Sequence, residues 1–488
     1  MNARPTIVHA FRPARGWVPA LVWVYAAGAA PASGAGESES GSDAVVIDRR
    51  SAVARASAQN PQVLAESADV LKAEAQLAQV DAAKHPEMNL TLGVVNSLAA
   101  DNTDRDANGV QSRREAYGDF DFGQLRPGFV ARLNVVQPLY TFGKISLRER
   151  AAEASGRAAR AKTEITAADV AITVAELYES HLYAKELLLF VEDVKGVAGR
   201  SIQETQDRLD VGAFDVKKQD LLRLQFALGM AEVIENQAEA ALAQTREGLR
   251  AYLAYAPGTQ LELREDHLDP VSDAASVLEE LIGLAREQRP ELRALQQGIH
   301  AYEHLARAEH AGWFPNIFAM GFLSAAYTPD RDWIQSRYVV DPLGHFVAGA
   351  LVGAQWKVQW DTASAKADEV ESEAFRLRNL LAWAESGVPA EITRYHEDVH
   401  RARADIEQMK QTLPVTKEWV VRSTADFSAG FGDSREVTDA VQAYVTAKNA
   451  QLNAVYRLNL ALAQLAKATG TLVNGPSFLY PGEPKAKP

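Results

Sequence analysis

The chain repeats one arrangement of residues twice. In the first copy, Asn60-Pro61 opens an alanine-rich helical stretch that closes at His85-Pro86. In the second copy, Arg289-Pro290 opens a stretch that closes at Phe314-Pro315. The proline-to-proline intervals, 61 to 86 and 290 to 315, are both 25 residues, and the copies are offset by 229 residues. Internal duplication predicts one architecture built from two similar halves. The first structural repeat is placed at 48–270 and the second at 271–474.

Each copy continues with a strand, a polar loop, a second strand, a very long helix, a glycine-containing turn and a helix that closes at Gly258 or Gly470. The predicted strands are 87–96, 128–138, 316–326 and 346–360. Along the second strand, Phe129 and Leu133 share one face, and Arg132 and Asn134 share the other. One apolar and one polar face suits a membrane barrel with a wet lumen, and equally a half-buried sheet.

Aromatic residues gather near the predicted strand ends, where they fit either an interfacial girdle or an ordinary core: Tyr140, Phe142, Trp313, Phe314, Trp356 and Trp360. The helices favour the membrane interpretation. Good helix formers fill the interval between Pro138 and Pro257, and Lys144 to Leu209 predicts one helix of about 100 Å. Alanines at its apolar positions are typical of closely packed coiled-coil walls. In the second copy, Pro389 and Pro414 are expected to bend or break the helix.

The helices are expected to turn back near 211–215 and 429–433. Gly212 and Gly430 permit the positive φ of a tight helix end, and an aspartate follows each glycine and can cap the next helix.

Three terminal segments are set apart from the repeats. Residues 1–32 carry three arginines before a short apolar run and a small-residue cleavage site, which predicts a secretory signal peptide. Residues 33–47 are a low-complexity linker, and 475–488 a proline-rich, disordered tail. The chain has no cysteine, so disulfides, thiol chemistry and a lipoprotein anchor are excluded.

Removing the three arginines of the signal takes the net charge from −13 to −16, which argues against nucleic acid as a partner. No run of 18 or more apolar residues follows the signal, so the sequence predicts no membrane-spanning helix. Four strands cannot close a barrel, and unpaired strand edges are strongly disfavoured in lipid. If the strands lie in a membrane, the chain must therefore form oligomers.

The sequence resembles the TolC family of outer-membrane efflux and secretion channels from about Asp48 to Gly470. Three elements carry this resemblance: the duplicated proline-to-proline helix that leads into a strand; the strand-end element Val136-Gln137-Pro138-Leu139-Tyr140-Thr141-Phe142-Gly143; and Phe427-Ser428-Ala429-Gly430 followed by Glu436-Val437-Thr438-Asp439-Ala440. The second copy lacks the proline of the strand-end element.

The resemblance implies a mainly α fold with a small β part. Long helices form an α-barrel, and four membrane strands per chain form a trimeric twelve-stranded β-barrel. It implies an outer-membrane location in a Gram-negative bacterium, extending into the periplasm. The implied function is the passive exit duct of a tripartite efflux pump or a type I secretion system. The implied partners are a homotrimer, a periplasmic adaptor (membrane fusion) protein, an inner-membrane transporter of RND or ABC type, and outer-membrane lipid. Neither a cofactor nor enzymatic activity is implied.

The resemblance also assigns residues to two sites. Val211, Gly212, Ala429 and Gly430 match the hairpin tips that contact the adaptor. Glu436 and Asp439 match acidic rings at the periplasmic aperture; the alternative is that both acids simply start a helix, where the helix dipole stabilises them. Lys217 and Lys218 depart from the family pattern, and we hypothesise that one of them pairs with Glu436 or Asp439.

Two alternative functions remain open from the residues alone. A periplasmic coiled-coil adaptor or scaffold would share the long helices, but it would have one hairpin rather than two. A secreted zinc metalloprotease is suggested only by two strings, His396-Glu397-Asp398-Val399-His400 and His300-Ala301-Tyr302-Glu303-His304. Neither string lies in a recognisable catalytic domain, so no catalytic or metal-binding residue is predicted.

Overall fold

A computed structural model describes residues 45–101, 104–105, 111–112, 119–214, 216–271, 277–329 and 341–473, with side chains described outside 98–124. The predicted signal peptide, the linker up to residue 44 and the tail at 475–488 lie outside these residues. So do most of the two polar loops between the strands.

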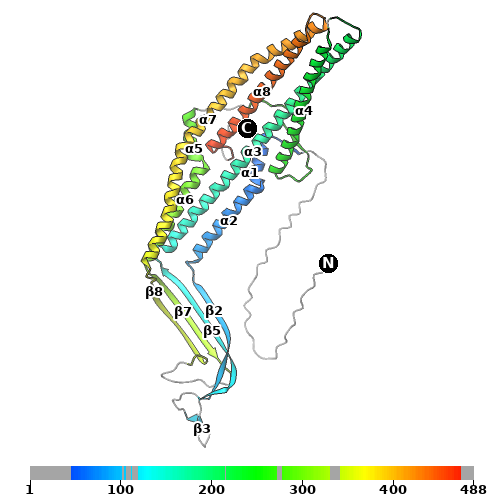
Figure 1. Cartoon of the computed structure of the whole chain (residues 1–488). Helices are drawn as coiled ribbons and strands as arrows, with labels where there is room; N and C mark the ends of the chain where they lie inside the picture. Colours follow the sequence, from blue (N-terminus) through cyan, green and yellow to red (C-terminus); the bar gives the residue numbers. More distant parts are fainter. Residues whose placement is uncertain are drawn as a thin grey trace, which may run out of the picture. The chain divides into compact units, whose positions relative to one another are not determined.

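The duplicated order of elements is confirmed (Figure 1). The first repeat contains β1 (Val45–Ile47), α1 (Arg49–Gln59), α2 (Pro61–Ala82), β2 (Glu87–Asp101), β3 (Asp104–Arg105), β4 (Gln111–Ser112), β5 (Asp119–Tyr140), α3 (Lys144–Asp210), α4 (Lys218–Tyr252) and β6 (Leu261–Leu263). The second contains α5 (Leu278–Gln288), α6 (Pro290–His310), the 3₁₀ turn η1 (Ala311–Trp313), β7 (Asn316–Tyr327), β8 (His345–Gln355), α7 (Trp360–Ser428) and α8 (Ser434–Thr469). Pro61 and Pro290 occupy the first position of α2 and α6, where a missing N–H costs no hydrogen bond.

Four sequence predictions are corrected. Residues 45–47 of the predicted linker form β1, which pairs in parallel with β6. The predicted strand 346–360 ends at Gln355, because its neighbour β7 begins at Asn316, which pairs with Gln355 and leaves no partner for later residues. Of the bend or break expected at Pro389 and Pro414, the break does not occur, because α7 continues through both prolines for 69 residues.

The fourth correction concerns the helix expected to close at Gly258. Helix α4 ends at Tyr252, where Arg55 of α1 and Asn60, the cap residue between α1 and α2, bind the backbone carbonyls of Tyr252 and its C-cap Leu253. Asn60 Nδ2 donates to Tyr252 O at 2.9 Å, and Arg55 Nε donates to Leu253 O at 2.9 Å. Leu253 is fully buried in the main core and anchors this turn.

The helices pack as antiparallel hairpins. Helix α3 lies along α4, α2 and α6, and α7 lies along α8 and α6. Small side chains fill these seams, including Ala154, Ala171 and Ala367, each fully buried. This agrees with the close packing predicted from the alanines. No helix in the described residues is both long enough and apolar enough to cross a membrane.

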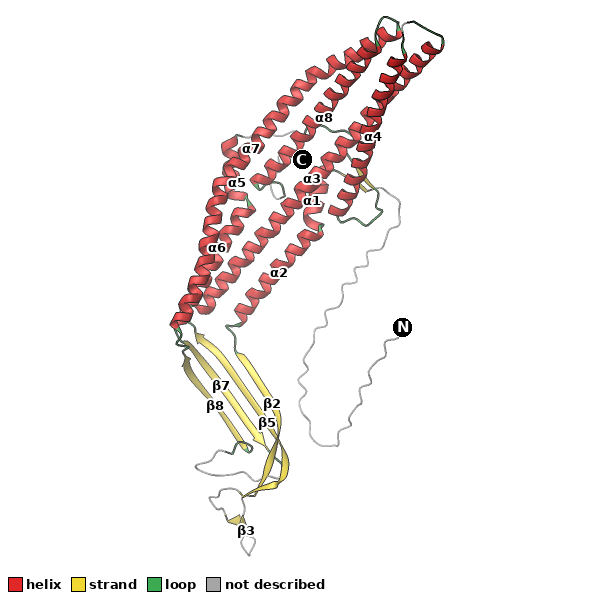
Figure 2. Cartoon of the chain, viewed as in Figure 1, coloured by secondary structure: helices red, strands yellow, loops and turns green. Residues whose placement is uncertain are grey.

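Figure 2 shows the four long strands together at one end of the helices. They form one antiparallel sheet in the order β2-β5-β7-β8, so the strand pairs of the two repeats are joined through β5 and β7. The outer edges of β2 and β8 have no partner among the strands that the structure describes.

Candidate functional site

The first hairpin turns at exposed residues. Helix α3 ends at Asp210, and Gly212 follows with φ +73°, which favours glycine. Val211 and Phe214 are 82% and 103% exposed, so the turn presents apolar side chains to its surroundings. Asp215 lies outside the described residues. The next helix is instead capped from within, because the Lys217 N–H donates to Asp220 Oδ2 at 2.8 Å.

The second hairpin turns in a similar way. Helix α7 ends at Ser428, Gly430 has φ +82°, and Phe431 is 91% exposed. Asp433 is the N-cap of α8, and its side chain accepts from Arg435 N at 3.1 Å, as the sequence predicts. Each tip therefore combines a left-handed glycine with one exposed phenylalanine.

The two tips are joined by contacts that sequence reasoning missed. Ser434 Oγ donates to Asp220 Oδ1 at 2.5 Å, and Arg208 Nη1 donates to Phe427 O at 2.9 Å. Val216 and Val437 pack with Phe427 in a small core between the hairpins. Asp220 is buried. The sequence indicates a role for it only through its position three residues after the N-cap, where an acidic side chain can cap the helix.

The four predicted aperture residues are all exposed on these tips, but the structure does not pair them. Asp439 Oδ2 lies 3.8 Å from Arg435 Nε, within one turn of α8. Among the residues described, no ion pair within the chain joins Lys217 or Lys218 to Glu436 or Asp439. The predicted pairing is thus not formed inside a single chain.

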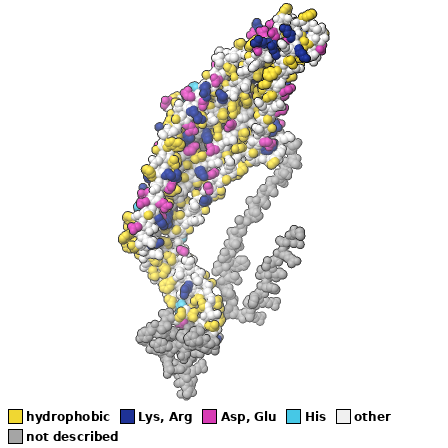
Figure 3. Space-filling model, viewed as in Figure 1, with side chains coloured by type: hydrophobic (Ala, Val, Ile, Leu, Met, Phe, Trp, Pro, Cys, Tyr) yellow, Lys and Arg dark blue, Asp and Glu magenta, His cyan; other side chains and the backbone are white. Residues whose placement is uncertain are grey.

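One face of the sheet is apolar except for Asn96 and Gln137, near the two ends of the strands. The register places the following side chains together on this apolar face: Met88, Leu90, Leu92, Val94, Phe129, Ala131, Leu133, Val135, Ala319, Leu323, Ala325, Tyr327, Phe346, Ala348, Ala350 and Val352. Leu92 and Val352 are both 71% exposed. Figure 3 shows charged side chains mainly over the helices in that view. An exposed apolar face of this extent marks a surface that contacts lipid or protein rather than water.

The opposite face, called the mixed face below, carries Asn89, Thr91, Arg132 and Asn134 in the first repeat and Phe318, Met320, Phe322 and Leu351 in the second. Alternation of an apolar and a partly polar face along each strand is the pattern of outer-membrane strands.

The predicted aromatic residues meet where strands join helices. Phe142 stacks on Phe314 with ring centroids 5.1 Å apart, and Tyr140 meets Phe142 edge-on at 4.7 Å. Trp356 Nε1 donates to Trp313 O at 3.1 Å. Most of these rings are about half exposed, so they form a surface belt rather than a core.

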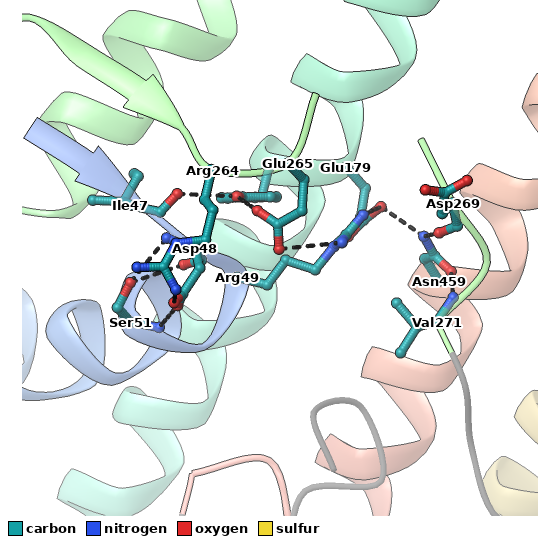
Figure 4. Close-up of polar contacts among 11 residues, drawn as sticks. Ile47, Asp48, Arg49, Ser51, Glu179, Arg264, Glu265, Asp269, Val271 and Asn459 are labelled. Atoms are coloured by element: carbon teal, nitrogen blue, oxygen red, sulfur yellow. Dashed lines mark hydrogen bonds and ion pairs between the residues drawn. The ribbon is translucent and has the colours of Figure 1, made fainter. Parts of the chain in front are cut away.

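A buried polar network joins the repeats near the middle of the helices (Figure 4). Arg49 Nε on α1 lies 2.5 Å from Glu179 Oε1 on α3, and Arg49 Nη1 lies 3.3 Å from Glu265 Oε1 after β6. Asn459 on α8 donates to Glu179 Oε2 at 2.7 Å and accepts from Val271 N at 2.9 Å. One arginine thus offsets two carboxylates, and an amide carries the network into the second repeat.

Tyr178 completes this network as a donor. Its hydroxyl donates to Glu265, and burial together with that carboxylate raises the pKa of Tyr178. The phenol therefore stays protonated at neutral pH and can donate its proton to the Glu265 carboxylate in a hydrogen bond.

The two histidine strings do not form a metal centre. The rings of His396 and His400 on α7 pack in a T shape with centroids 4.5 Å apart, and His300 Nδ1 lies 3.8 Å from Glu303 Oε2 on α6. No group of three or more potential metal ligands occurs among the described residues.

Solved outer-membrane proteins have the same fold. The chain matches the outer-membrane channel CmeC of Campylobacter jejuni with a TM-score of 0.67 and 15% identity, covering 86% of this chain and 85% of that one. It matches the outer-membrane protein VceC of Vibrio cholerae with a TM-score of 0.68 and 14% identity, covering 86% and 96%. Protein CyaE of Bordetella pertussis is 25% identical over 338 residues, which is 68% of each chain.

Paired long helices that continue into a sheet with one apolar face, together with the match of residues 52–254 to outer membrane efflux proteins, indicate an outer-membrane exit duct for efflux or secretion, which extends into the periplasm. Residues 52–254 match the family model of outer membrane efflux proteins. The resemblance to the TolC family is therefore confirmed. The family and the fold are those of channels rather than enzymes. Channels of this kind are trimers that work with adaptors and inner-membrane transporters.

Proposed function

We propose that three copies of this chain form one passive duct whose strands close into a twelve-stranded barrel in outer-membrane lipid. One observation carries the proposal: the sheet combines an exposed apolar face with unpaired edges on β2 and β8. Lipid offers no partner for those backbone groups, whereas pairing β2 of one chain with β8 of the next satisfies them. The apolar face then contacts lipid, and the mixed face lines the lumen.

The hairpin tips contact the periplasmic adaptor in this proposal. The α3–α4 and α7–α8 turns lie at the end of the helices remote from the sheet (Figure 1). Val211 and Phe214 in the first turn and Phe431 in the second are exposed apolar side chains. Gly212 and Ala429-Gly430 let the backbone itself approach a partner closely. An adaptor that covers these residues removes apolar surface from water. The duct has no energy source of its own, so an inner-membrane transporter of RND or ABC type supplies the cargo.

Glu436 and Asp439 form the periplasmic aperture in this proposal. Both are exposed near the start of α8, and three-fold symmetry brings three copies of each carboxylate toward one axis. Rings of carboxylates favour cations over anions. Because Lys217 and Lys218 have no aperture partner inside their own chain, their pairing with these acids would be between neighbouring chains.

Single-channel recording in a planar bilayer tests the duct and the aperture together. The wild type is expected to conduct with a preference for cations. Glu436→Ala/Asp439→Ala should lower that preference and raise conductance, and Lys217→Ala/Lys218→Ala should raise conductance by loosening the closed tip. Glu369→Ala, an exposed acid on α7 away from the tips, is the matched control.

Each outcome separates one part of the proposal from the rest. A wild-type trimer that never conducts rejects the duct. Conduction that the acidic double variant leaves unchanged keeps the duct and rejects the aperture residues. Unchanged conductance in the lysine variant rejects the lysine pairing alone.

A further inference from the structure

The two copies of the strand pair agree on one face and differ on the other. At the offset of 229 residues, Asn89 corresponds to Phe318, Thr91 to Met320 and Gly93 to Phe322. All of these lie on the mixed face. On the apolar face, both copies keep apolar or small residues: Met88 and Ile317, Leu90 and Ala319, Leu92 and Gly321, Val94 and Leu323. At these three positions of the mixed face, the second copy has a large apolar side chain where the first copy has a polar or small one, whereas the next position changes from Val95 to Ser324.

The register places these differences side by side. Asn89 on β2 pairs with Asn134 on β5, Asn134 lies opposite Phe322 on β7, and Phe322 lies opposite Gly349 on β8. A row across the mixed face thus changes from amide to aromatic within one chain. Neither β7 nor β8 contains an Asp, Glu, Lys or Arg.

Two aromatic rings occupy the space beside glycines of the neighbouring strand. A Cβ built at Gly349 would come within 2.6 Å of Phe322 Cζ, and one at Gly353 within 3.2 Å of Phe318 Cζ. Rings over strand glycines cover bare backbone and stiffen the sheet. Met320 and Leu351 are paired between them. Phe318, Met320, Phe322 and Leu351 therefore form a smooth apolar strip, about 14 Å long at 3.4 Å per residue.

One cation lies next to the apolar strip. Arg132 on β5 pairs with Ser324, which is two residues from Phe322 on the same face. Diagonal neighbours of this kind lie about 7–8 Å apart, within reach of a long side chain. Arg132 is exposed, and no ion pair is recorded for it among the residues that the structure describes.

We propose that the apolar strip and Arg132 together form a binding surface on the lumen wall for small organic anions that have a flat aromatic or alkyl body. The body lies on Phe318 and Phe322, and the anionic group meets the Arg132 guanidinium. This inference rests on the proposed function, because the mixed face is a lumen wall only in the closed trimer. It names the class of cargo that the wall retains in transit.

The dimensions favour a small molecule as the occupant. In the trimer, three apolar strips alternate with three polar rows that contain Asn89 and Asn134. Each strip spans only two strands, or about 10 Å. A naphthyl group or a short alkyl chain fits such a strip while the polar rows keep the rest of the lumen hydrated.

Block of single-channel current by 2-naphthalenesulfonate tests the inference on the full-length trimer. Phe318→Ser/Phe322→Ser should raise the half-blocking concentration about tenfold or more, since it removes both rings from the wall. Arg132→Gln should raise it about three- to fivefold. Methanesulfonate, which has the anionic group without the body, should not block.

Two further variants act as controls. Asn89→Ser/Asn134→Ser alters the mixed face on the polar side and should leave block unchanged. Asn89→Phe places an aromatic ring at the position equivalent to Phe318, and it should lower the half-blocking concentration. This gain tests the inference even if the serine variant of Phe318 and Phe322 does not assemble.

The outcomes are distinct. Loss of block in the phenylalanine variant, or gain in Asn89→Phe, with normal open-channel conductance supports the apolar strip. Equal block in all variants overturns it while the duct stands. Stronger block by (2-naphthylmethyl)trimethylammonium than by the sulfonate overturns the role of Arg132. A wild-type trimer that does not conduct overturns both this inference and the proposed function.

Discussion

The two repeats have nearly the same secondary structure but differ in the side chains that it carries. Helices α3 and α7 have 67 and 69 residues, and α4 and α8 have 35 and 36. Both strand pairs keep one apolar face. The repeats differ on the mixed face and in the interactions that fasten helix ends. A duplicated fold thus keeps the periodicities that bury surface, whereas positions that face a lumen or solvent are free to change.

The largest expected difference between the repeats concerns their arginine–glutamate pairs. Arg49→Ala should destabilise the protein by roughly 3–5 kcal/mol, because Glu179 would remain buried without its cation. Arg289→Ala should cost about 1 kcal/mol or less, because its partner Glu391 in the second repeat is 37% exposed. Denaturant unfolding followed by circular dichroism measures both changes. Equal losses of unfolding free energy would show that the two ion pairs stabilise their repeats to the same extent.

The next-largest difference is expected between alanine substitutions at the two glycines predicted to end the last helix of each repeat. Both have positive φ, +88° at Gly258 and +78° at Gly470. A Cβ at Gly470 would come within 2.8 Å of the Gln288 backbone, whereas one at Gly258 meets no atom within 4 Å. Gly470→Ala should therefore cost about 2–4 kcal/mol and Gly258→Ala about 1 kcal/mol. Thermal melting of the two variants compares them, and a more harmful Gly258→Ala would contradict the geometry.

The smallest expected effect is a dependence on pH in the first hairpin. His181 on α3 faces α4, with its Nδ1 2.9 Å from Thr245 Oγ1, and burial lowers the pKa of His181 from 6.5 to about 4. The unfolded chain binds a proton there as pH falls below about 6.5, whereas the folded chain does not until about 4. Stability should therefore fall as pH drops through this window. His181→Gln should flatten that part of the stability profile, and an unchanged profile would exclude this histidine.

Local residue patterns were enough to predict much of the fold. The paired Asn-Pro and Arg-Pro starts, the strand alternation and the helix from Lys144 all act over a few residues. Tertiary packing decided the rest. The helix at Pro389 continues because Val388 and Ile392 are buried beside it, and this packing outweighs a lost backbone hydrogen bond. Residues 356–360 were expected to extend the strand, but they do not, because a strand needs a neighbouring strand to pair with as well as an alternating pattern.

The site was predicted unevenly for the same reason. The roles of the turn glycines and of Asp433 depend on local backbone conformation, so they could be predicted from the sequence. The network of Arg49, Glu179 and Asn459 joins residues far apart along the chain, and no spacing rule connects them. The assignment of Glu436 and Asp439 depends on neighbouring chains and stays a prediction.

The short pairing of β1 with β6 has a consequence for the order of folding. Because these two strands are parallel, the entire first repeat forms the crossover between them. The ends of so long a loop meet at a large entropic cost, so this pairing is expected to form late, after the helices have packed. During export from the N-terminus, β1 cannot pair until β6 has also crossed the inner membrane. Formation of the β1–β6 pair therefore completes the first repeat while the second repeat is still being exported.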